Sequence, residues 1–574
     1  MKKAFKKLLS LVLALSACTS AIACVNPGTG NDDSSSEEKI DTTKYILNVS
    51  TYDGGFGYEW LYEIKDRYEE LHENDYYANG TLKGVQVKIN PIKEKAGELA
   101  NSVLGGPNDV YFTEYAYYHE LYDQGIFADI SEAVAADLSV YNDGDAEGVS
   151  IESKLTEEQK DYFKINGKYY AIPHYAGYSG IVYNKRLFDN NNYYFAKNRG
   201  NTTQSQFITA TNSVKSAGPN GIEGDYDDGL PATYEEFFTL CKWIDEAESA
   251  PVVTVNGNSY NTYTNGLINA LAVDYEGLEQ FKLNYSFNGT ATNLATFSGN
   301  KVVLDANDTV ITEDNGYELT RQAGKAYGLQ FVQRLLTENN NAYMNTATGK
   351  AFDSQTYFHT DAQKDFIREQ RAMLIEGIWW QSEATKAFAD AAYDFGDDYS
   401  KEGSDFAWMP LPKATEDQVG DPITLMDNIN SVCFMKGGIT GEARDVALDF
   451  IKFCHTNESL VNFTQITDTP KAFNYTLTKD EKANLTPFAK SLLNIKELPN
   501  TKIVYPYGST EFYKANQRMI CEIFYSTLDG YNYLQAAPTF INPDNTKTAE
   551  DYFLGMYNYR KGAWDDYKDQ VAKK

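Results

Sequence analysis

The stretch YILNVSTYDGGFGYEWLYEIKDRYEELHEN, residues 45–74, contains the features that decide the fold. It begins with alternating apolar residues, passes through a glycine loop at 54–57, and then places apolar residues at helical spacing, namely Trp60, Leu61, Ile64, Tyr68 and Leu71. We therefore expect a strand, a glycine loop and a helix. The loop by itself is also compatible with a simple turn.

The same alternation continues along the chain. GVQVKIN (84–90) predicts a second strand, and 106–134 predicts a third strand followed by a helix. Further on, Thr233 and Glu236 form a capping box at a helix start, and 440–454 has one apolar helical face. Strands that alternate with helices indicate parallel α/β sheets, in which ligands gather at the carboxyl ends of the strands.

The N-terminus has the composition of a targeting segment. MKKAFKK (1–7) is basic, and LLSLVLAL (8–15) is apolar but too short to span a membrane. We expect region 1–23 to contain a lipoprotein signal peptide, cleaved before Cys18, which fits a bacterial lipobox better, or before Cys24, which the polar segment follows directly. A plain secretory signal is the alternative.

Residues 25–43 lack apolar periodicity, and we expect them to form a flexible tether. No later run of about 20 apolar residues suggests a transmembrane helix. The mature chain is therefore expected at the extracellular face of the bacterial cell membrane, anchored by lipid alone.

Composition excludes several partners. The formal net charge of −30 repels phosphate backbones, so we expect no nucleic acid partner. There are five histidines and no Cys/His cluster at zinc spacing, so we expect no metal and no other cofactor. Cys241 and Cys454 fall on apolar helix faces and are expected to be buried thiols. Tyrosine is abundant, 44 of 574 residues, and its flat apolar ring with a hydroxyl at the rim suits contact with sugar.

Five motifs occur in one order along the chain: GKYYAIP (167–173), GIVYNKRLF (180–188), GLPATYEEF (229–237), AMLIEGIWW (372–380) and FAWMPLPKA (406–414). This ordered set resembles the family 1 extracellular solute-binding proteins, which are the ligand-capturing lipoproteins of sugar ABC transporters and include maltose-binding protein. The similarity runs from about residue 44 to about residue 495, and more weakly to the C-terminus.

The resemblance implies an α/β fold of the periplasmic-binding-protein type (type II), with a ligand cleft between two lobes that close on a hinge. The first lobe would take 44–178 and 426–475. The second lobe would take 179–425 and 476–574, including a surface insertion at about 190–229.

The resemblance also implies site residues. The family's stacking tryptophan falls on Trp379, and its neighbour Trp380, which must point elsewhere, would anchor the lobe. After the third strand the family's cleft residues fall on Thr113, Ala116 and Tyr117, which leaves Glu114 and Tyr115 as the polar and aromatic groups there. The other candidate contacts are Tyr52, Asp53, Phe56, Tyr117, Tyr175, Tyr178, Glu376, Phe512 and Tyr513, with His174, directly after the first motif, as an alternative to Tyr175 and Tyr178.

We expect a monomeric binding protein, not an enzyme, that captures a carbohydrate, in particular an oligosaccharide, and delivers it to the permease of an ABC transporter. One alternative is a secreted glycan-acting hydrolase, for which Glu114 and Glu376 are candidate carboxylates. The other is a ligand-sensing subunit of a signalling receptor. No nucleophile elbow, metal box or phosphate loop supports an enzyme.

Overall fold

The computed structural model of the chain describes residues 39–93, 97–114, 116–246, 253–254, 262–337, 359–427, 429–498, 500–521, 540 and 546–573. Thr42–Lys574 form one compact unit. Cys18, Cys24, most of the predicted tether and Tyr115 lie outside the described residues.

The first sheet has five strands in the order β4-β1-β5-β18-β8. Its strands are β1 (Tyr45–Tyr52), β4 (Val85–Ile92), β5 (Val110–Thr113), β8 (Ile172–Pro173) and β18 (Val432–Met435). β1 is parallel to both β4 and β5, whereas β18 is antiparallel to β5 and β8. A strand from much later in the chain therefore completes this sheet.

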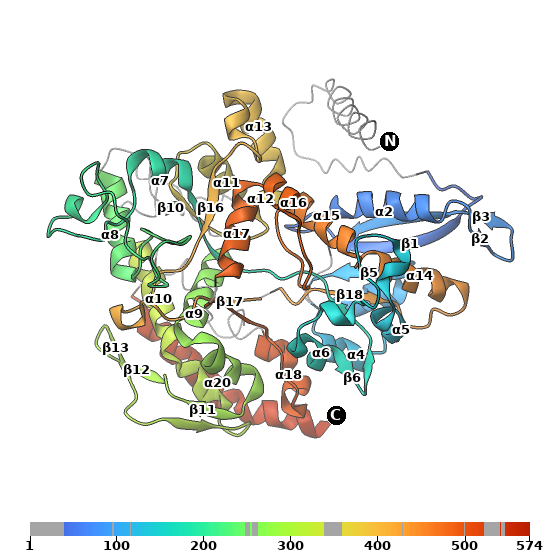
Figure 1. Ribbon diagram of the computed structural model, residues 1–574. Helices are drawn as coiled ribbons and strands as arrows, with labels where there is room; N and C mark the ends of the chain where they lie inside the picture. Colours follow the sequence, from blue (N-terminus) through green and yellow to red (C-terminus); the bar gives the residue numbers. More distant parts are fainter. Residues whose placement is uncertain are drawn as a thin grey trace, which may run out of the picture. The chain divides into compact units, whose positions relative to one another are not determined.

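The helix that follows β1 is α2 (Trp60–Leu71). Trp60, Leu61, Ile64 and Tyr68 are buried on one of its faces, as their spacing predicts, while Leu71 at the last turn is exposed. α2 contacts β4, and α14 (Glu442–Phe453) contacts β1 and β18, so both helices lie beside the first sheet (Figure 1).

The second sheet has four strands in the order β10-β15-β9-β16. Its strands are β9 (Ser179–Asn184), β10 (Val253–Thr254), β15 (Met373–Gly377) and β16 (Phe406–Met409). β9 is antiparallel to both β15 and β16, and β15 is buried along its whole length. The helices that contact this sheet include α7 (Lys185–Asn191), α9 (Thr262–Ser286), α11 (His359–Ile367) and α17 (Pro487–Glu497).

The chain passes from the first sheet to the second after β8 and returns before β18, and the two crossings are fastened together. The Tyr175 N–H donates to Ser431 Oγ at 3.0 Å, and that hydroxyl donates to the Tyr175 carbonyl at 2.6 Å. The Gly177 N–H donates to Asp427 Oδ1 at 3.1 Å. Gly177 is needed there, because a Cβ would lie 2.0 Å from Ile429 Cδ1.

The remaining elements are further helices and the strands of five separate two-stranded sheets. They are α3 (Leu99–Gly105), α4 (Tyr118–Asp123), α5 (Ser131–Ala135), α6 (Glu157–Phe163), α8 (Tyr234–Glu246), α10 (Ala323–Thr337), α12 (Trp380–Glu383), α13 (Thr385–Phe395), α15 (Asn457–Thr467), α16 (Lys479–Asn484), α18 (Glu511–Cys521) and α20 (Ala549–Lys573), with the short strands β2 (Tyr76–Tyr77), β3 (Leu82–Lys83), β6 (Lys164–Ile165), β7 (Lys168–Tyr169), β11 (Gly289–Ala291), β12 (Ala295–Ser298), β13 (Lys301–Leu304), β14 (Thr309–Ile311), β17 (Thr424–Met426) and β19 (Lys502–Val504).

The stretch at about 190–229 is not a purely superficial insertion. Tyr193, Tyr194 and Phe195 are buried, and Phe207 packs between Phe195 and Trp243. Its aromatic residues therefore anchor a segment whose Asn, Gly, Thr and Ser content suggested only surface.

Two further expectations concern cysteines and membrane spans. Cys241, Cys433, Cys454 and Cys521 are buried thiols. Within the described part of the chain, no helix combines the length and the apolar character needed to cross a membrane.

Candidate functional site

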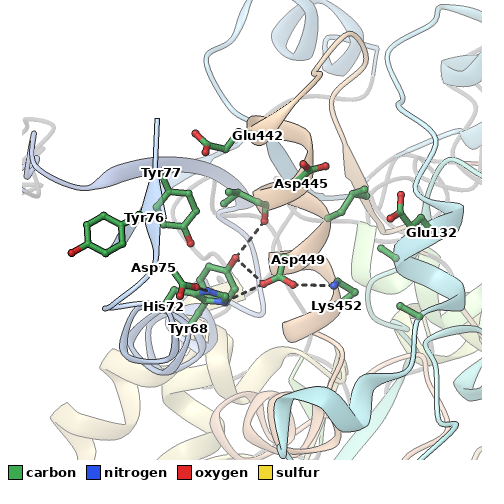
Figure 2. Close-up of a pocket in the computed structure, with 14 residues that line it drawn as sticks. Tyr68, His72, Asp75, Tyr76, Tyr77, Glu132, Glu442, Asp445, Asp449 and Lys452 are labelled. Atoms are coloured by element: carbon green, nitrogen blue, oxygen red, sulfur yellow. Dashed lines mark hydrogen bonds and ion pairs between the residues drawn. The ribbon is translucent and has the colours of Figure 1, made fainter. Parts of the chain in front are cut away.

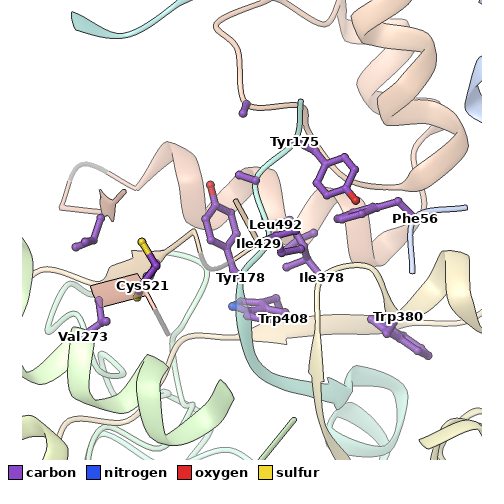
Figure 3. Packing of buried hydrophobic residues seen from close by; sticks show 14 of the residues in the cluster. Phe56, Tyr175, Tyr178, Val273, Ile378, Trp380, Trp408, Ile429, Leu492 and Cys521 are labelled. Atoms are coloured by element: carbon purple, nitrogen blue, oxygen red, sulfur yellow. The ribbon is translucent and has the colours of Figure 1, made fainter. Parts of the chain in front are cut away.

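An aromatic group lies where the carboxyl ends of β1 and β15 meet. Phe56 follows β1, Tyr175 lies on the first crossing, and Trp379 follows β15. The ring centres of Phe56 and Tyr175 are 4.2 Å apart, and those of Phe56 and Trp379 are 6.2 Å apart. Figure 3 shows the rings of Phe56 and Tyr175 side by side. The structure thus brings together three predicted contacts from distant parts of the chain.

Two glycines permit this close approach of backbone to indole. A Cβ on Gly55 would lie 2.4 Å from Trp379 Cδ1. A Cβ on Gly377 would lie 2.2 Å from the far ring of the same indole. The glycine loop is therefore more than a turn, since it lets the first sheet touch the tryptophan of the second.

Trp379 and Trp380 have different environments. Trp379 is half-buried, whereas Trp380 is 0 % exposed. The Trp380 ring packs against four phenylalanines, Phe366, Phe388, Phe406 and Phe488, at centre distances between 5.3 and 5.7 Å. The burial of Trp380 agrees with the expected anchor. The ligand contact of Trp379 stays a prediction.

A polar network lies beside Trp379. Gln363 Nε2 donates to Glu376 Oε1 at 3.1 Å and to Glu383 Oε2 at 2.8 Å, so one amide bridges two carboxylates. Glu383 Oε2 also accepts from the Tyr263 hydroxyl at 3.1 Å. The ring centres of Tyr263 and Trp379 are 6.2 Å apart. The network therefore runs from the side of the indole to the buried carboxyl of Glu376.

The two carboxylates of this network differ in protonation. Burial, together with the charge of Glu383, raises the pKa of Glu376 well above its usual value. Burial would raise the pKa of Glu383 as well, but hydrogen bonds from His359, Gln363 and Tyr263 lower it below its usual value. Glu383 is therefore the ionised partner of the pair.

Glu114 supplies a third carboxyl from the first sheet. It follows β5 and accepts a hydrogen bond from the Tyr175 hydroxyl. Burial raises the pKa of Glu114 to about 7, opposed by Tyr175 and Lys93 and increased by the charge of Glu383. Glu114 thus adds a buried carboxyl from the end of β5 to this site.

The other predicted residues near β1 and β8 are placed less centrally. Tyr52 is half-buried against Gly54, and Asp53 is exposed. Tyr117 is buried beneath the guanidinium of Arg518, 6.0 Å from its ring centre. Tyr178 is buried on the first crossing beside Ile378 and Trp408, as Figure 3 shows.

The structure does not bring Phe512 and Tyr513 to this group. Phe512 is 1 % exposed and packs against Phe287 and Trp564, and the Tyr513 hydroxyl donates to the Pro506 carbonyl. Both belong to the buried face of α18, and we do not retain them as ligand contacts. His174 is also buried, with its Nδ1 2.8 Å from Lys471 Nζ.

Sequence reasoning missed Tyr263, His359, Gln363 and Glu383. Glu383 had a usable signal, because it lies four residues after Trp379 and its N–H donates to the Trp379 carbonyl at 3.1 Å in a helical turn. The other three come from helices α9 and α11 and belong to no motif.

A cavity lies elsewhere, between α2, β2, α5 and α14. This α14 groove has a volume of about 450 Å³ and is lined by Tyr68, His72, Asp75, Tyr76, Tyr77, Glu132, Ala133, Ala136, Glu442, Asp445, Val446, Leu448, Asp449 and Lys452. Figure 2 shows interactions converging on Asp449, which lies 3.1 Å from His72 Nε2 and 2.9 Å from Lys452 Nζ. The charged groups at the centre of the groove, Asp449, His72 and Lys452, are therefore paired with one another.

Comparisons with known proteins bear on the fold. No protein-family model matches the sequence, and no curated protein matches it significantly. Among solved structures, one from work on xylan utilization by Caldanaerobius polysaccharolyticus aligns with 90 % of this chain and 99 % of its own, at 14 % identity and a TM-score of 0.53. A chitin oligosaccharide binding protein aligns with 91 % and 100 %, at 12 % identity and 0.52. Maltose-bound MalE3 of T. maritima aligns with 90 % and 99 %, at 14 % identity and 0.50.

The chain has the two-lobed fold of these binding proteins. The expected α/β fold class is thereby confirmed. The first sheet takes its strands from residues before 178 and after 426, and the second sheet takes its strands from the residues between them. The lobe boundaries themselves remain a prediction.

Proposed function

We propose that this chain is an extracellular binding protein that captures an oligosaccharide between its two lobes. The observation that carries the proposal is the half-buried ring of Trp379 beside the carboxyls of Glu376 and Glu383. A flat indole offers a surface for the C–H face of a pyranose, and carboxylate oxygens accept hydrogen bonds from its hydroxyls. Similar folds named for maltose and for chitin oligosaccharide binding support the same ligand class.

The remaining parts of the proposal come from the sequence. The basic and apolar N-terminus with Cys18 or Cys24 supports a lipid anchor at the outer face of the cell membrane. Resemblance to the solute-binding lipoproteins supports delivery of the ligand to an ABC transporter permease. A monomer suffices for this role, because one chain supplies both lobes.

One observation favours the hydrolase alternative. Glu376 and Glu383 have pKa values displaced in opposite directions, as an acid and a base would need. The geometry opposes it, because both carboxylates bond to one Gln363 nitrogen and Glu376 is 1 % exposed. They share one side of the site instead of flanking a glycosidic bond.

The test is a panel of neutral oligosaccharides, including maltose-type, xylan-type and chitin-type oligomers. Thermal melts should show stabilisation by at least one of them, since a ligand at 100 times its Kd adds about 2.7 kcal/mol. Chromatography after long incubation should return the stabilising glycan uncut. Stabilisation by none of them contradicts the proposed function, and a shortened glycan supports the hydrolase.

A further inference from the structure

An acidic loop closes the stretch at about 190–229. Its sequence is PNGIEGDYDDG, residues 219–229, which contains three aspartates within four positions. The loop is joined to the second sheet, because the Tyr226 hydroxyl donates a hydrogen bond to the Trp408 carbonyl on β16. These carboxyls therefore belong to a folded part of the second lobe, and they are not members of the network beside Trp379.

Asn220 holds two of the carboxyls in this loop close together. Its N–H donates to Asp227 Oδ2 at 3.0 Å, and its Nδ2 donates to Asp225 Oδ2 at 2.7 Å. The chain wraps closely around this pair, since a Cβ on Gly218, which has a φ of +64°, would lie 2.3 Å from the Asp227 carbonyl oxygen. Two neighbouring carboxylates repel each other unless a proton or a cation compensates their charge.

The side chain of Asp227 points to a bound group. Asp227 is 0 % exposed, and its Oδ1 has no hydrogen-bond partner among the described residues. Leaving a buried carboxylate oxygen unpaired is costly, so this atom is suited to contact a positive charge. Asp228 Oδ1 is also buried without a hydrogen bond in the described part of the chain. The charge of Lys215 partly compensates that of Asp228, so Asp227 is the stronger indication of a bound cation.

The ligand chemistry of the loop favours Ca²⁺. Residues 218–229 contain neither cysteine nor histidine, and they offer carboxylate, amide and main-chain oxygens, which hard cations prefer. Among the described residues, no three Asp, Glu, His or Cys side chains can hold a metal ion by themselves. Ca²⁺ accommodates this, because it takes about six to eight oxygens and accepts main-chain carbonyls and water beside carboxylates.

We propose that the loop at 218–229 binds a Ca²⁺ ion, with the carboxyls of Asp225 and Asp227 as its charged ligands. The expectation of no metal rested on the missing Cys/His pattern of zinc sites, and a calcium site needs neither residue. The ion would stabilise the loop against β16, which is a structural role beyond the proposed glycan binding. Extracellular modules bind Ca²⁺ with a Kd of about 0.1–1 mM, and we expect that range here.

The test uses chelator-treated full-length protein without glycan. Calorimetry with CaCl2 at neutral pH should show one bound ion per chain. Thermal melts in about 10 mM CaCl2 should give a melting temperature higher by a few degrees, because a ligand of the folded state stabilises it. MgCl2 at the same concentration should raise it much less, since Mg²⁺ demands a nearly ideal octahedron. Neither heat nor a shift with CaCl2 overturns the proposal, and a proton on Asp227, whose pKa burial and Asp225 raise to about 8, then compensates the pair.

Variants assign the ion to this loop. Asp227→Asn still accepts a hydrogen bond from Asn220 but lacks the charge, so its affinity for Ca²⁺ should fall about tenfold or more. Without calcium its melting temperature should equal or exceed that of wild type, because the repulsion between the two carboxyls is gone. Asp225→Asn, at a half-buried position, is the second variant should Asp227→Asn fail to fold.

Asp445→Asn in the α14 groove is the matched control and should bind Ca²⁺ as wild type does. Unchanged calcium binding by the folded loop variants overturns the assignment to this loop. All readouts are taken without glycan, so they stand apart from the outcome for the proposed function.

Discussion

Carboxylates gather in two regions of this molecule, the α14 groove and the surroundings of Trp379. In the groove, Asp449 meets His72, Lys452 and Tyr141, and these partners hold its pKa well below its usual range although burial alone would raise it. Beside Trp379, burial raises the pKa of Glu376 and of Glu114, and amides and phenols are the main partners.

This difference indicates which of the two regions, the α14 groove or the surroundings of Trp379, is functional. In the groove, which has a volume of about 450 Å³, the contact of Asp449 with His72 joins α14 to the end of α2. The network beside Trp379 is costly to fold, because it holds carboxyls away from water without a cation for each. Perturbed titratable groups of this kind cluster at functional sites.

The largest expected effect lies in the groove. Asp449→Ala removes the acceptor shared by His72 Nε2 at 3.1 Å, Lys452 Nζ at 2.9 Å and the Tyr141 hydroxyl at 2.6 Å. Breaking such a partly buried cluster should lower the free energy of unfolding by about 3 kcal/mol. Urea unfolding measures this loss, while calorimetry should give an unchanged Kd for the glycan. Weaker glycan binding with an unchanged free energy of unfolding would indicate that the groove, and not the site around Trp379, is the functional region.

The second effect tests whether burial of the Glu114 carboxyl destabilises the folded state. The pKa of Glu114 is raised to about 7, so between pH 4.5 and about 7 the folded state keeps a proton that the unfolded state has lost. Wild-type stability therefore falls as pH rises through that window. Glu114→Gln cannot ionise and can still accept from Tyr175. The free energy of unfolding of this variant, relative to that of wild type, should rise by up to roughly 3 kcal/mol between pH 4.5 and pH 8. A difference that does not change with pH would argue that burial of Glu114 does not destabilise the fold.

The third effect concerns ligand affinity. Trp379→Ala removes the half-buried ring, and truncation of such an aromatic contact should weaken binding by about 2 kcal/mol, roughly thirtyfold in Kd. Trp243→Ala is the matched control, since Trp243 is also half-buried but stacks on Phe207. Calorimetry on both variants decides the matter. Normal glycan binding by Trp379→Ala would show that the indole does not contact the ligand.

The smallest effect returns to the groove. Hydrogen bonds to Asp449 and Asp75 raise the pKa of His72 above 6.5, although burial acts to lower it. The stability that His72 supplies is therefore complete below pH 6.5 and is lost as the pH rises through its folded-state pKa. Across that range the melting temperature of wild type should fall slightly more than that of His72→Gln, which retains the other titrating groups. Parallel curves would show that the pairing of His72 contributes little.

The sequence predicted the local features and the neighbours within each motif. The strand and helix at 45–71 and the apolar face of α14 follow from periodicity, and Trp379 and Trp380 differ in burial, as the different directions of adjacent side chains suggest. It could not supply Tyr263 or Gln363, because α9 and α11 reach the site only through tertiary packing. Phe512 and Tyr513 follow from the resemblance alone, and the structure places both on the buried face of the amphipathic helix α18.

The interleaving of the sheets has a consequence for the order in which the chain can fold. β8 lies at the edge of the first sheet and pairs there with β18, whereas every strand of the second sheet precedes residue 432. The first sheet thus begins first and is completed last. A growing polypeptide that has reached Met409 holds all four strands of the second sheet, but the first still lacks the strand between β5 and β8. Pairings between such distant segments form slowly, so completion of the first sheet should limit the rate at which the chain matures.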